Sequence, residues 1–222
     1  MRLFVCLAFT AAALTVALPC AAAGPWTPAR RPGPVFHAYA AVDLDIFNAS
    51  QTFDAVVGSS HLPAYGGGVD VTDIWKHLFI RVAVTHLSKK GGRVFVDSGQ
   101  VFPLGIPLTL TMTPIEIGGG WRFAGKRPSR FAPYAGGAAL IVPYKETSAF
   151  GDAADNVSQS FTGAAVFAGV EASVTRSITV GGEAQFRAIP NALGTAGASQ
   201  AYNETDLGGV TARVTIGVKL GR

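Results

Sequence analysis

The chain has 222 residues, of which 49% are hydrophobic and only 14% are charged, and it contains 27 glycines. This composition is too hydrophobic for a disordered protein, and the length fits one domain or two small ones. The formal net charge of +4 is modest, and no basic stripe alternates with aromatic residues, so the sequence gives little support to nucleic-acid binding.

The N-terminus has the three parts of a secretory signal peptide. Arg2 supplies a positive charge, residues 3–18 form an apolar stretch, and residues 19–23 are mostly small and precede the expected cleavage. A transmembrane anchor is the alternative, but the apolar stretch is short for one. Cys6 and Cys20 both lie in this segment, so we expect neither a disulfide nor a thiolate metal site in the remaining chain.

The rest of the chain divides into a leader and a β-domain. Residues 24–34 contain four prolines and form an extended leader without a core of its own. From residue 35 onward, stretches of alternating apolar and polar residues predict strands with one apolar face. We therefore expect a signal peptide (1–23), a Pro-rich leader (24–34) and one β-domain (35–222).

Eight stretches are expected to be strands, and their connections alternate in length. The connections after the first, third, fifth and seventh strands are long and polar, whereas the others are short turns. The long connection between the third and fourth strands, residues 88–107, is expected to be a loop, with a short strand at residues 93–96 as the alternative for part of it. The strands are expected at residues 35–47, 64–71, 76–87, 108–123, 131–145, 162–172, 178–188 and 209–220.

The fourth strand changes the parity of its apolar positions. Apolar residues fall at even positions from Leu108 to Met112 and at odd positions from Ile115 to Trp121. The change occurs at Thr113–Pro114, where proline removes a backbone donor from the ladder. We therefore predict a bulge or bend at this point.

The hairpin of residues 162–188 shows which face of the strands is apolar. Val166 and Val180 belong to long apolar faces, whereas the opposite faces carry Glu171, Glu183 and Arg187. A soluble sandwich would bury the apolar faces against another sheet, and a membrane barrel would expose them to lipid. We favour the barrel for two reasons. Long and short connections alternate as they do in an up-and-down barrel, and an even number of strands closes without an edge.

In such a barrel the charged faces of the strands meet in the interior. An eight-stranded barrel has room inside only for side chains, and charges buried there must pair. We therefore predict a lumen closed by arginine–carboxylate contacts, with a narrow ion path along the same charges as the alternative. The predicted network consists of Asp43, Asp70, Arg81, Glu116, Glu171, Glu183, Arg187, Arg213 and Lys219.

Aromatic residues fall near both ends of the expected strands. Two such bands mark the two interfaces of a membrane, although aromatic residues also favour strands in general. The predicted periplasmic band consists of Phe36, Trp75, Trp121, Phe123, Phe131 and Tyr134. The predicted outer band consists of Phe47, Tyr144 and Phe161.

These features together resemble the small bacterial outer-membrane β-barrel proteins of the eight-stranded, OmpA-like type. The resemblance rests on the signal peptide, the strands of alternating apolar and polar residues, the alternation of long and short connections, and the glycine-rich hairpins. One departure is the end of the chain, Leu220-Gly221-Arg222, where such barrels commonly carry an aromatic residue that the assembly machinery reads. The resemblance implies an all-β, eight-stranded antiparallel up-and-down transmembrane barrel in the bacterial outer membrane.

Three local patterns bear on chemistry. His86-Leu87-Ser88 resembles the His-x-Ser of outer-membrane lipid A deacylases, but the pattern around it is missing, so ordinary strand-end residues are the better interpretation. Asp43-Leu44-Asp45 could face a hard cation, yet a lumen partner and an acid at the rim fit better. No helix follows Gly118-Gly119-Gly120, so this run indicates strand curvature or close approach and not a phosphate loop.

A basic cluster at Lys89, Lys90 and Arg93 falls in the second expected external loop. Lipopolysaccharide phosphates would be a natural counter-charge, and solvated loop cations are the alternative.

The resemblance implies a non-enzymatic, monomeric protein with a structural, adhesive or surface-recognition role. Its expected partners are outer-membrane lipids including lipopolysaccharide, the barrel-assembly machinery and periplasmic chaperones, with no nucleic acid, cofactor or metal ion. A small pore or ligand carrier is the alternative. A lipid A-modifying enzyme that uses His86 and Ser88 is a third interpretation.

Overall fold

The computed structural model describes residues 35–75, 77–97, 100–123, 130–148, 150, 156–195 and 197–220. The expected signal peptide (1–23) and leader (24–34) lie outside these residues. The strands are β1 (Val35–Phe47), β2 (His61–Thr72), β3 (Leu78–Asp97), β4 (Gln100–Met112), β5 (Ile115–Arg122), β6 (Phe131–Thr147), β7 (Val157–Ser173), β8 (Ile178–Ala188) and β9 (Gly209–Leu220). The helices are α1 (Ser50–Val57) and α2 (Gly197–Ala201).

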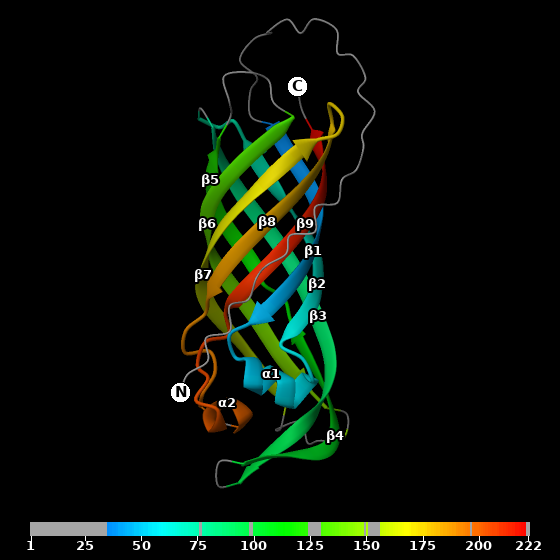
Figure 1. Cartoon of the computed structure of the whole chain (residues 1–222), viewed down its shortest axis with the longest axis vertical. Coiled ribbons are helices and arrows are strands. Elements are labelled where there is room, and N and C mark those ends of the chain that lie inside the picture. Colours follow the sequence, from blue (N-terminus) through cyan, green and yellow to red (C-terminus); the bar gives the residue numbers. More distant parts are fainter. Residues whose placement is uncertain are drawn as a thin grey trace, which may run out of the picture. The chain divides into compact units, whose positions relative to one another are not determined.

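The strands form a closed antiparallel barrel (Figure 1). The ring runs from β1 through β2, β3, β5, β6, β7 and β8 to β9, which pairs with β1 and closes it. β4 and β5 occupy the same position in the wall, because both pair with β3 on one side and β6 on the other. The prediction of an eight-stranded up-and-down barrel is therefore confirmed.

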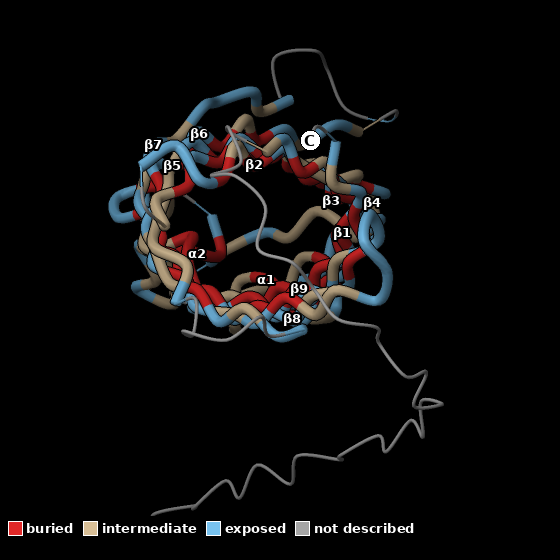
Figure 2. Tube along the Cα trace, turned by 90° about the horizontal axis from the view of Figure 1, so that it is seen from above, coloured by how far each residue is buried: buried red, intermediate tan, exposed pale blue. Residues whose placement is uncertain are grey.

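The two ends of the barrel differ in their connections. At one end, here the turn end, short connections join β2 to β3, β5 to β6 and β7 to β8, and Phe36 pairs there with Leu220. At the other, the loop end, lie α1, α2 and the hairpin formed by β3 and β4 (Figure 1). Seen along the barrel in Figure 2, both helices lie within the outline of the ring.

The apolar faces of the strands point away from the barrel axis, as predicted. Val166 and Val214 are 62% and 66% exposed, whereas Glu183 and Arg213 are 5% and 2% exposed. The outer wall therefore carries an apolar belt, while charges are turned inward. This arrangement suits a barrel surrounded by hydrocarbon and is the reverse of a soluble β-protein.

The expected loop at residues 88–107 is wrong, because most of it forms a long hairpin. β3 continues past Leu87 and pairs with β4 as far as Asp97 and Gln100, with one register shift between Gly92 and Val94. This segment lacks apolar alternation, so its sequence carries no strand period. Backbone pairing continues along the ribbon beyond the barrel wall (Figure 1).

Of the bulge or bend predicted at Thr113–Pro114, the bulge is wrong. The strand is interrupted there, but Leu87 pairs with Met112 and Val84 with Ile115, so no residue is inserted. Even-numbered side chains face inward on both sides of the interruption. Leu108, Leu110 and Met112, expected to face lipid, are buried in the interior, as is Glu116. The parity of the apolar positions changes because the interior is apolar near the loop end and ionic closer to the turn end.

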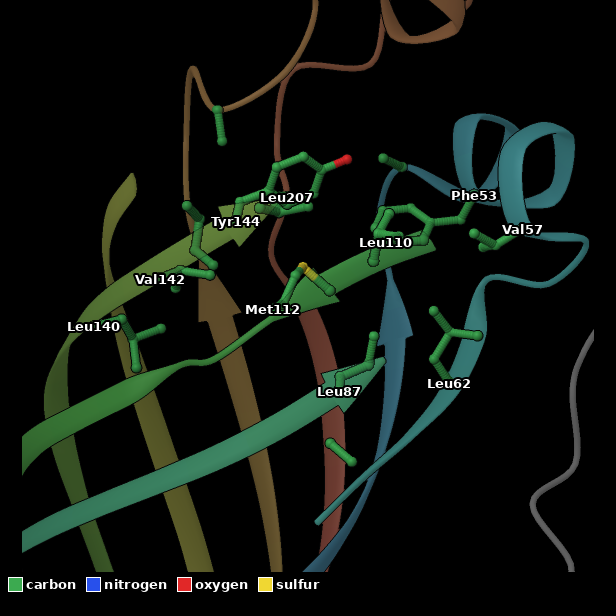
Figure 3. Packing of buried hydrophobic residues seen from close by; sticks show 14 of the residues in the cluster. Phe53, Val57, Leu62, Leu87, Leu110, Met112, Leu140, Val142, Tyr144 and Leu207 are labelled. Atoms are coloured by element: carbon green, nitrogen blue, oxygen red, sulfur yellow. The ribbon is translucent and has the colours of Figure 1, made fainter. Parts of the chain in front are cut away.

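The apolar part of the interior lies directly beneath the helices (Figure 3). Phe53 and Val57 of α1 pack against side chains that reach inward from several strands of the wall. The Phe53 ring also stacks on Phe47, with centroids 4.1 Å apart. The main members from the strands and the long connections are Leu62, Leu87, Leu110, Met112, Leu140, Val142, Tyr144 and Leu207.

Candidate functional site: the ionic interior and the loop-end surface

Arg213 of β9 lies at the centre of the ionic interior. Its Nε and Nη2 atoms each donate to Asp43 at 2.8 Å, and these two residues face each other across the β1–β9 pair. The same guanidinium donates to both carboxylate oxygens of Glu116 on β5, at 2.8 and 3.0 Å. Arg213 therefore connects β9 to β1 and also to β5. Its charge is compensated by carboxylates, as a buried guanidinium requires.

Arg187 of β8 forms a second centre, nearer the loop end. It donates to Asp45 at 3.0 Å, to Glu116 at 2.9 Å and to the Gln185 side chain at 3.0 Å. Asp45 also accepts a hydrogen bond from Thr211 at 2.5 Å. The expectation that Asp45 would be a rim acid is wrong, because its carboxylate is buried between Arg187 and Thr211.

Arg81 of β3 is held by carboxylates and enclosed by aromatic rings. It donates twice to Asp70, at 2.9 and 3.2 Å, and once to Glu183 at 2.5 Å. Its Cζ atom lies 4.8 Å from the centre of the Phe167 ring and 5.5 Å from that of Tyr134. Rings at this distance stabilise a guanidinium through their negative faces, so this layer combines ion pairs with cation–π contacts.

A fourth group of charges lies toward the turn end. Arg122 makes a two-point contact with Glu171, at 2.7 and 3.2 Å, and the Lys219 ammonium lies 2.8 Å from the same carboxylate. His37 Nε2 shares a hydrogen bond of 2.7 Å with Thr179, and its Nδ1 lies 3.6 Å from Glu171. Lys219 is the most exposed member, since 27% of its side chain is accessible.

All nine residues of the predicted network lie in the interior and contact opposite charges. Sequence reasoning left out His37, Asp45, Arg122, Gln185 and Thr211. The strand period was a usable signal, since each shares its parity with a predicted neighbour, as Arg122 does with Glu116. Among the described residues the connected group contains six carboxylates and five permanent cations, together with His37.

A small cavity separates the ionic interior from the apolar cluster. Asp45 and Arg187 border it on one side, and Met112, Leu140 and Ile189 line much of the rest. Its volume is about 20 Å³. One water molecule needs roughly 10–15 Å³. The cavity therefore has room for about one water molecule and not for an organic ligand.

Carboxylates from the β8–β9 connection organise the loop end. Glu204 accepts hydrogen bonds from the backbone N–H groups of Gln51 and Thr52, at 3.1 and 2.8 Å, and from the Thr52 hydroxyl at 2.7 Å. These donors lie in the first turn of α1, whose preceding residue, Ala49, has no side chain able to cap it. Glu204 therefore supplies the N-terminal cap of α1 from a distant part of the chain.

Asp206 ties together the segments that surround α2. It accepts hydrogen bonds from the N–H groups of Ile189 and Gly208, both at 2.8 Å, and from the Asn48 amide at 2.9 Å. Partial burial raises the pKa of Asp206, but these three donors outweigh that effect and hold the pKa below its ordinary value.

His86 and Ser88 share the outward face of β3, just beyond the apolar belt. His86 Nδ1 shares a hydrogen bond of 3.1 Å with the Thr113 hydroxyl. Within the described part of the chain, neither Ser88 nor a carboxylate is recorded as a hydrogen-bond or ion-pair partner of His86. A base that is neither bonded to the nucleophile nor oriented by an acid lacks the usual features of an activated hydroxyl.

The predicted aromatic bands need correction. Phe36, Trp75, Phe123 and Phe131 are exposed, and Trp121 is half-buried. Tyr134 and Tyr144 are each 6% exposed and point into the barrel, because the even positions of β6 face inward. Phe47 and Phe161 pack against the interior apolar cluster. Tyr65 and Phe186, which the sequence reasoning did not select, are instead exposed on the outer wall.

The basic residues expected in an external loop lie on a strand instead. Lys89, Lys90 and Arg93 belong to β3. Lys89 is on the same strand face as the inward Leu87, whereas Lys90 is on the same face as Ser88.

The glycines of β5 and β6 lie where two strands come close together. Gly136 lies beneath the Phe167 ring, and a Cβ built there would come within 3.0 Å of both that ring and backbone atoms. Gly120, which pairs with Gly136, is equally crowded, so these glycines mark a close approach of strands.

The described residues contain no helix that is both long and apolar enough to cross a membrane. They also contain no group of three or more His, Asp or Glu residues arranged to hold a metal ion.

No family model matches the sequence, and a search of curated proteins finds no match. Solved structures do match. The outer membrane protein OprG from Pseudomonas aeruginosa has a TM-score of 0.61 at 12% identity, over 86% of this chain and 98% of that chain. Ail, the attachment invasion locus protein of Yersinia pestis, has a TM-score of 0.51 at 11% identity, over 85% and 99%. Neisserial surface protein A has a TM-score of 0.50 at 15% identity, over 86% and 97%.

At these identities the likeness establishes the fold. The chain has the fold of the small, eight-stranded bacterial outer-membrane barrels, and its exposed apolar belt is the exterior that such a location requires. In barrels of this kind the short turns are periplasmic and the long loops extracellular. The turn end corresponds to the periplasmic end of such barrels, and the loop end, with the helices and the β3–β4 ribbon, corresponds to their extracellular end.

Proposed function

We propose that this chain is a closed, non-conducting outer-membrane barrel with a structural, adhesive or surface-recognition role. The observation that carries the proposal is the filled interior. Arg81, Arg187 and Arg213 each contact carboxylates from two or more strands, so their side chains bridge the width of the barrel. The apolar cluster and α1 cover this layer on the extracellular side.

The extracellular ribbon supports a role at the cell surface. Phe95 and Phe102 are paired residues near its tip, and they are 53% and 50% exposed. Leu104 is similarly exposed. Exposed aromatic and aliphatic groups on a projecting hairpin are typical of contact surfaces, since burying them against a partner removes them from water.

The alternative of a pore or ligand carrier has less support. The cavity beside the ionic layer has room for about one water molecule, and the charged side chains next to it are buried and paired. The alternative of a lipid-modifying enzyme is weakened by the geometry at His86, whose recorded partner is Thr113.

Planar-bilayer recordings test the proposal. The folded full-length barrel, inserted at low density, should show no discrete conductance steps, because its ion pairs leave no continuous aqueous path. Heat-modifiable gel migration of the same preparation serves as the control for folding. Stepwise currents that change in size or selectivity when Arg213→Gln is introduced would contradict a closed lumen and favour the pore.

A further inference from the structure

The described ionic interior has one more carboxyl group than permanent cations, and the excess lies near the loop end. Toward the turn end the two kinds of charge are equal in number, and Arg122 Nη2 lies 4.0 Å from Asp70 Oδ2 and so links the layers there. That part contains Asp70, Glu171, Glu183, Arg81, Arg122 and Lys219. Nearer the loop end, the three carboxyl groups of Asp43, Asp45 and Glu116 share two guanidinium groups, those of Arg187 and Arg213.

Asp45 has the weakest compensation of these three acids. Asp43 receives two hydrogen bonds of 2.8 Å from Arg213. Glu116 receives hydrogen bonds from both arginines, at 2.8 to 3.0 Å. For Asp45, the cationic contact recorded among the described residues is a single nitrogen of Arg187 at 3.0 Å. An ionised Asp45 would therefore be the least balanced charge of this group.

The two oxygens of the Asp45 carboxyl group have different surroundings. Arg187 and Thr211 both donate to Oδ1, at 3.0 and 2.5 Å, and the described residues include no recorded donor to Oδ2. Asp45 is only 3% exposed, and it borders the small cavity whose other lining residues include Met112 and Leu140. A buried carboxylate oxygen without a donor is costly, whereas a protonated oxygen can donate to a water molecule, for which the cavity has room.

His37 is the other group able to take up the missing positive charge. Its Nδ1 atom lies 3.6 Å from Glu171 and 3.8 Å from Asp70. These two acids already contact three permanent cations, one of which, Lys219, is the cross-strand neighbour of His37. A proton on His37 would place a fourth positive charge beside two acids, so the balance of charge favours Asp45.

We infer that Asp45 is a proton-binding site and that its carboxyl group is protonated in the closed barrel at neutral pH. Oδ1 accepts from Arg187 and Thr211, and Oδ2 carries the hydrogen. In alkali, hydroxide takes this proton and becomes water, and an unmatched carboxylate is left. Its charge should hydrate the cavity and loosen the contact between the ionic interior and the apolar cluster. The inference rests on the ionic interior and not on the proposed role at the cell surface.

Infrared spectroscopy of the folded full-length chain in detergent tests the protonation. A protonated carboxyl group has a carbonyl band that a carboxylate lacks. At neutral pH this band should be present, should shift in D₂O, and should be lost in Asp45→Asn. Asp54→Asn is the matched control and should keep the band, because Asp54 is exposed on α1, outside the ionic interior. A spectrum of the unaltered chain without the band, or a band that persists in Asp45→Asn, would overturn the inference.

The pH dependence of unfolding gives a second readout, which a purely structural role of Asp45 would not move. The folded chain holds a proton that the unfolded chain releases, so a rise in pH favours unfolding. Between about pH 5 and pH 7, the unfolding equilibrium constant of the unaltered chain should rise more steeply than that of Asp45→Asn, by about tenfold per pH unit. Equal slopes would contradict the proton site.

The Asp45→Asn variant should fold, because its amide oxygen still accepts from Arg187 and Thr211, and heat-modifiable migration checks this. Failure of the inference is distinguishable from failure of the proposed function. An ionised Asp45 in a barrel without conductance overturns the proton site and leaves the closed lumen standing. Conductance steps at neutral pH overturn the closed lumen, whereas the infrared band is still measured on the same folded preparation.

Discussion

Arg213 shows how one buried side chain joins segments that are remote in the sequence. It is paired with Asp43, 170 positions away, and with Glu116, 97 positions away. Removing one partner of a buried ion pair leaves the other charges without compensation, whereas the pair itself adds little to stability compared with apolar packing. The side chain is therefore better viewed as fixing the register of the closed ring than as a source of net stability.

Replacing Arg213 by Met should lower the free energy of unfolding by roughly 3–5 kcal/mol, because Asp43 loses its two-point partner in a dry interior. Urea unfolding of the barrel in detergent, followed by tryptophan fluorescence, measures this. Lys219→Met is the matched control and should cost less than about 1 kcal/mol, since Lys219 is partly exposed and Glu171 keeps Arg122. Equal losses of unfolding free energy in the two variants would mean that the Arg213 ion pairs matter no more for stability than the Lys219 contact.

The strand period was sufficient to place the charged residues inside, but not to choose their partners. Asp43 faces Arg213, Asp70 faces Arg81 and Glu183 faces Arg213 only through the register between strands. Register depends on turn geometry and on the whole interior, which local alternation does not contain. Tyr134 was misplaced for a related reason, since the small residues of β6 leave its alternation unreadable.

At the scale of elements, α1 illustrates a helix without a local signal. It has eight residues, and Ala49 at its N-cap provides no side-chain hydrogen bond. The carboxylate that caps it, Glu204, lies more than 150 positions away. Sequence rules for helix starts depend on neighbouring residues, so they could not find this one. Apart from the short strand considered at residues 93–96, the β3–β4 ribbon was not predicted, because polar and glycine residues obscure its alternation.

The segment around Asp206 should respond to acid in a defined direction. Because the folded-state pKa lies below the ordinary carboxyl value of 3.8, its contribution is present above that value and lost as pH falls through the lower, folded-state pKa. Limited proteolysis should therefore leave residues 189–208 resistant at neutral pH and cleave them in strong acid with an acid-active protease.

Asp206→Asn separates this effect from general acid denaturation. The amide lacks the negative charge that holds the Ile189 and Gly208 N–H groups, so the segment should be cleaved faster at neutral pH while the barrel keeps its heat-modifiable migration. Unchanged cleavage in this variant would show that packing, and not the Asp206 hydrogen bonds, fixes the segment.

At the scale of the whole molecule, the barrel has two interiors stacked along its axis. The ionic one lies toward the turn end, and the apolar one lies next to the helices at the loop end. The sequence reasoning recovered the closed ring and its outward apolar face, because both follow from period-two alternation over many strands. It did not recover the second interior, because Leu108 to Met112 read as a lipid-facing stretch until the preserved register showed that they point inward.

The β3–β4 ribbon should be separable from the barrel. Replacing residues 93–106 by an Asn-Gly turn keeps the Gly92–Pro107 pair and all the β3–β4 pairs between it and the barrel wall. The barrel should therefore fold and migrate as before. If the proposed role is adhesive, adhesion of cells displaying this variant to their target surface should fall to background, because the exposed apolar tip is lost. Phe95→Ser/Phe102→Ser, which keeps the ribbon, should lose most of the adhesion too. Undiminished adhesion in both would assign the contact to another surface.

The pairing of Asp43 with Arg213 across β1 and β9 has a consequence for biogenesis. The two strands are the first and last of the described strands to be synthesised. Asp43 has its partners, Arg213 and Arg187, on β9 and β8, so its charge remains uncompensated until the ends of the sheet meet. An open sheet would present these groups to acyl chains at high cost, so we expect closure and membrane insertion to be one concerted step. The Asp43–Arg213 ion pair must also break before β1 and β9 can separate. The inserted protein should therefore unfold slowly even where its equilibrium stability is ordinary.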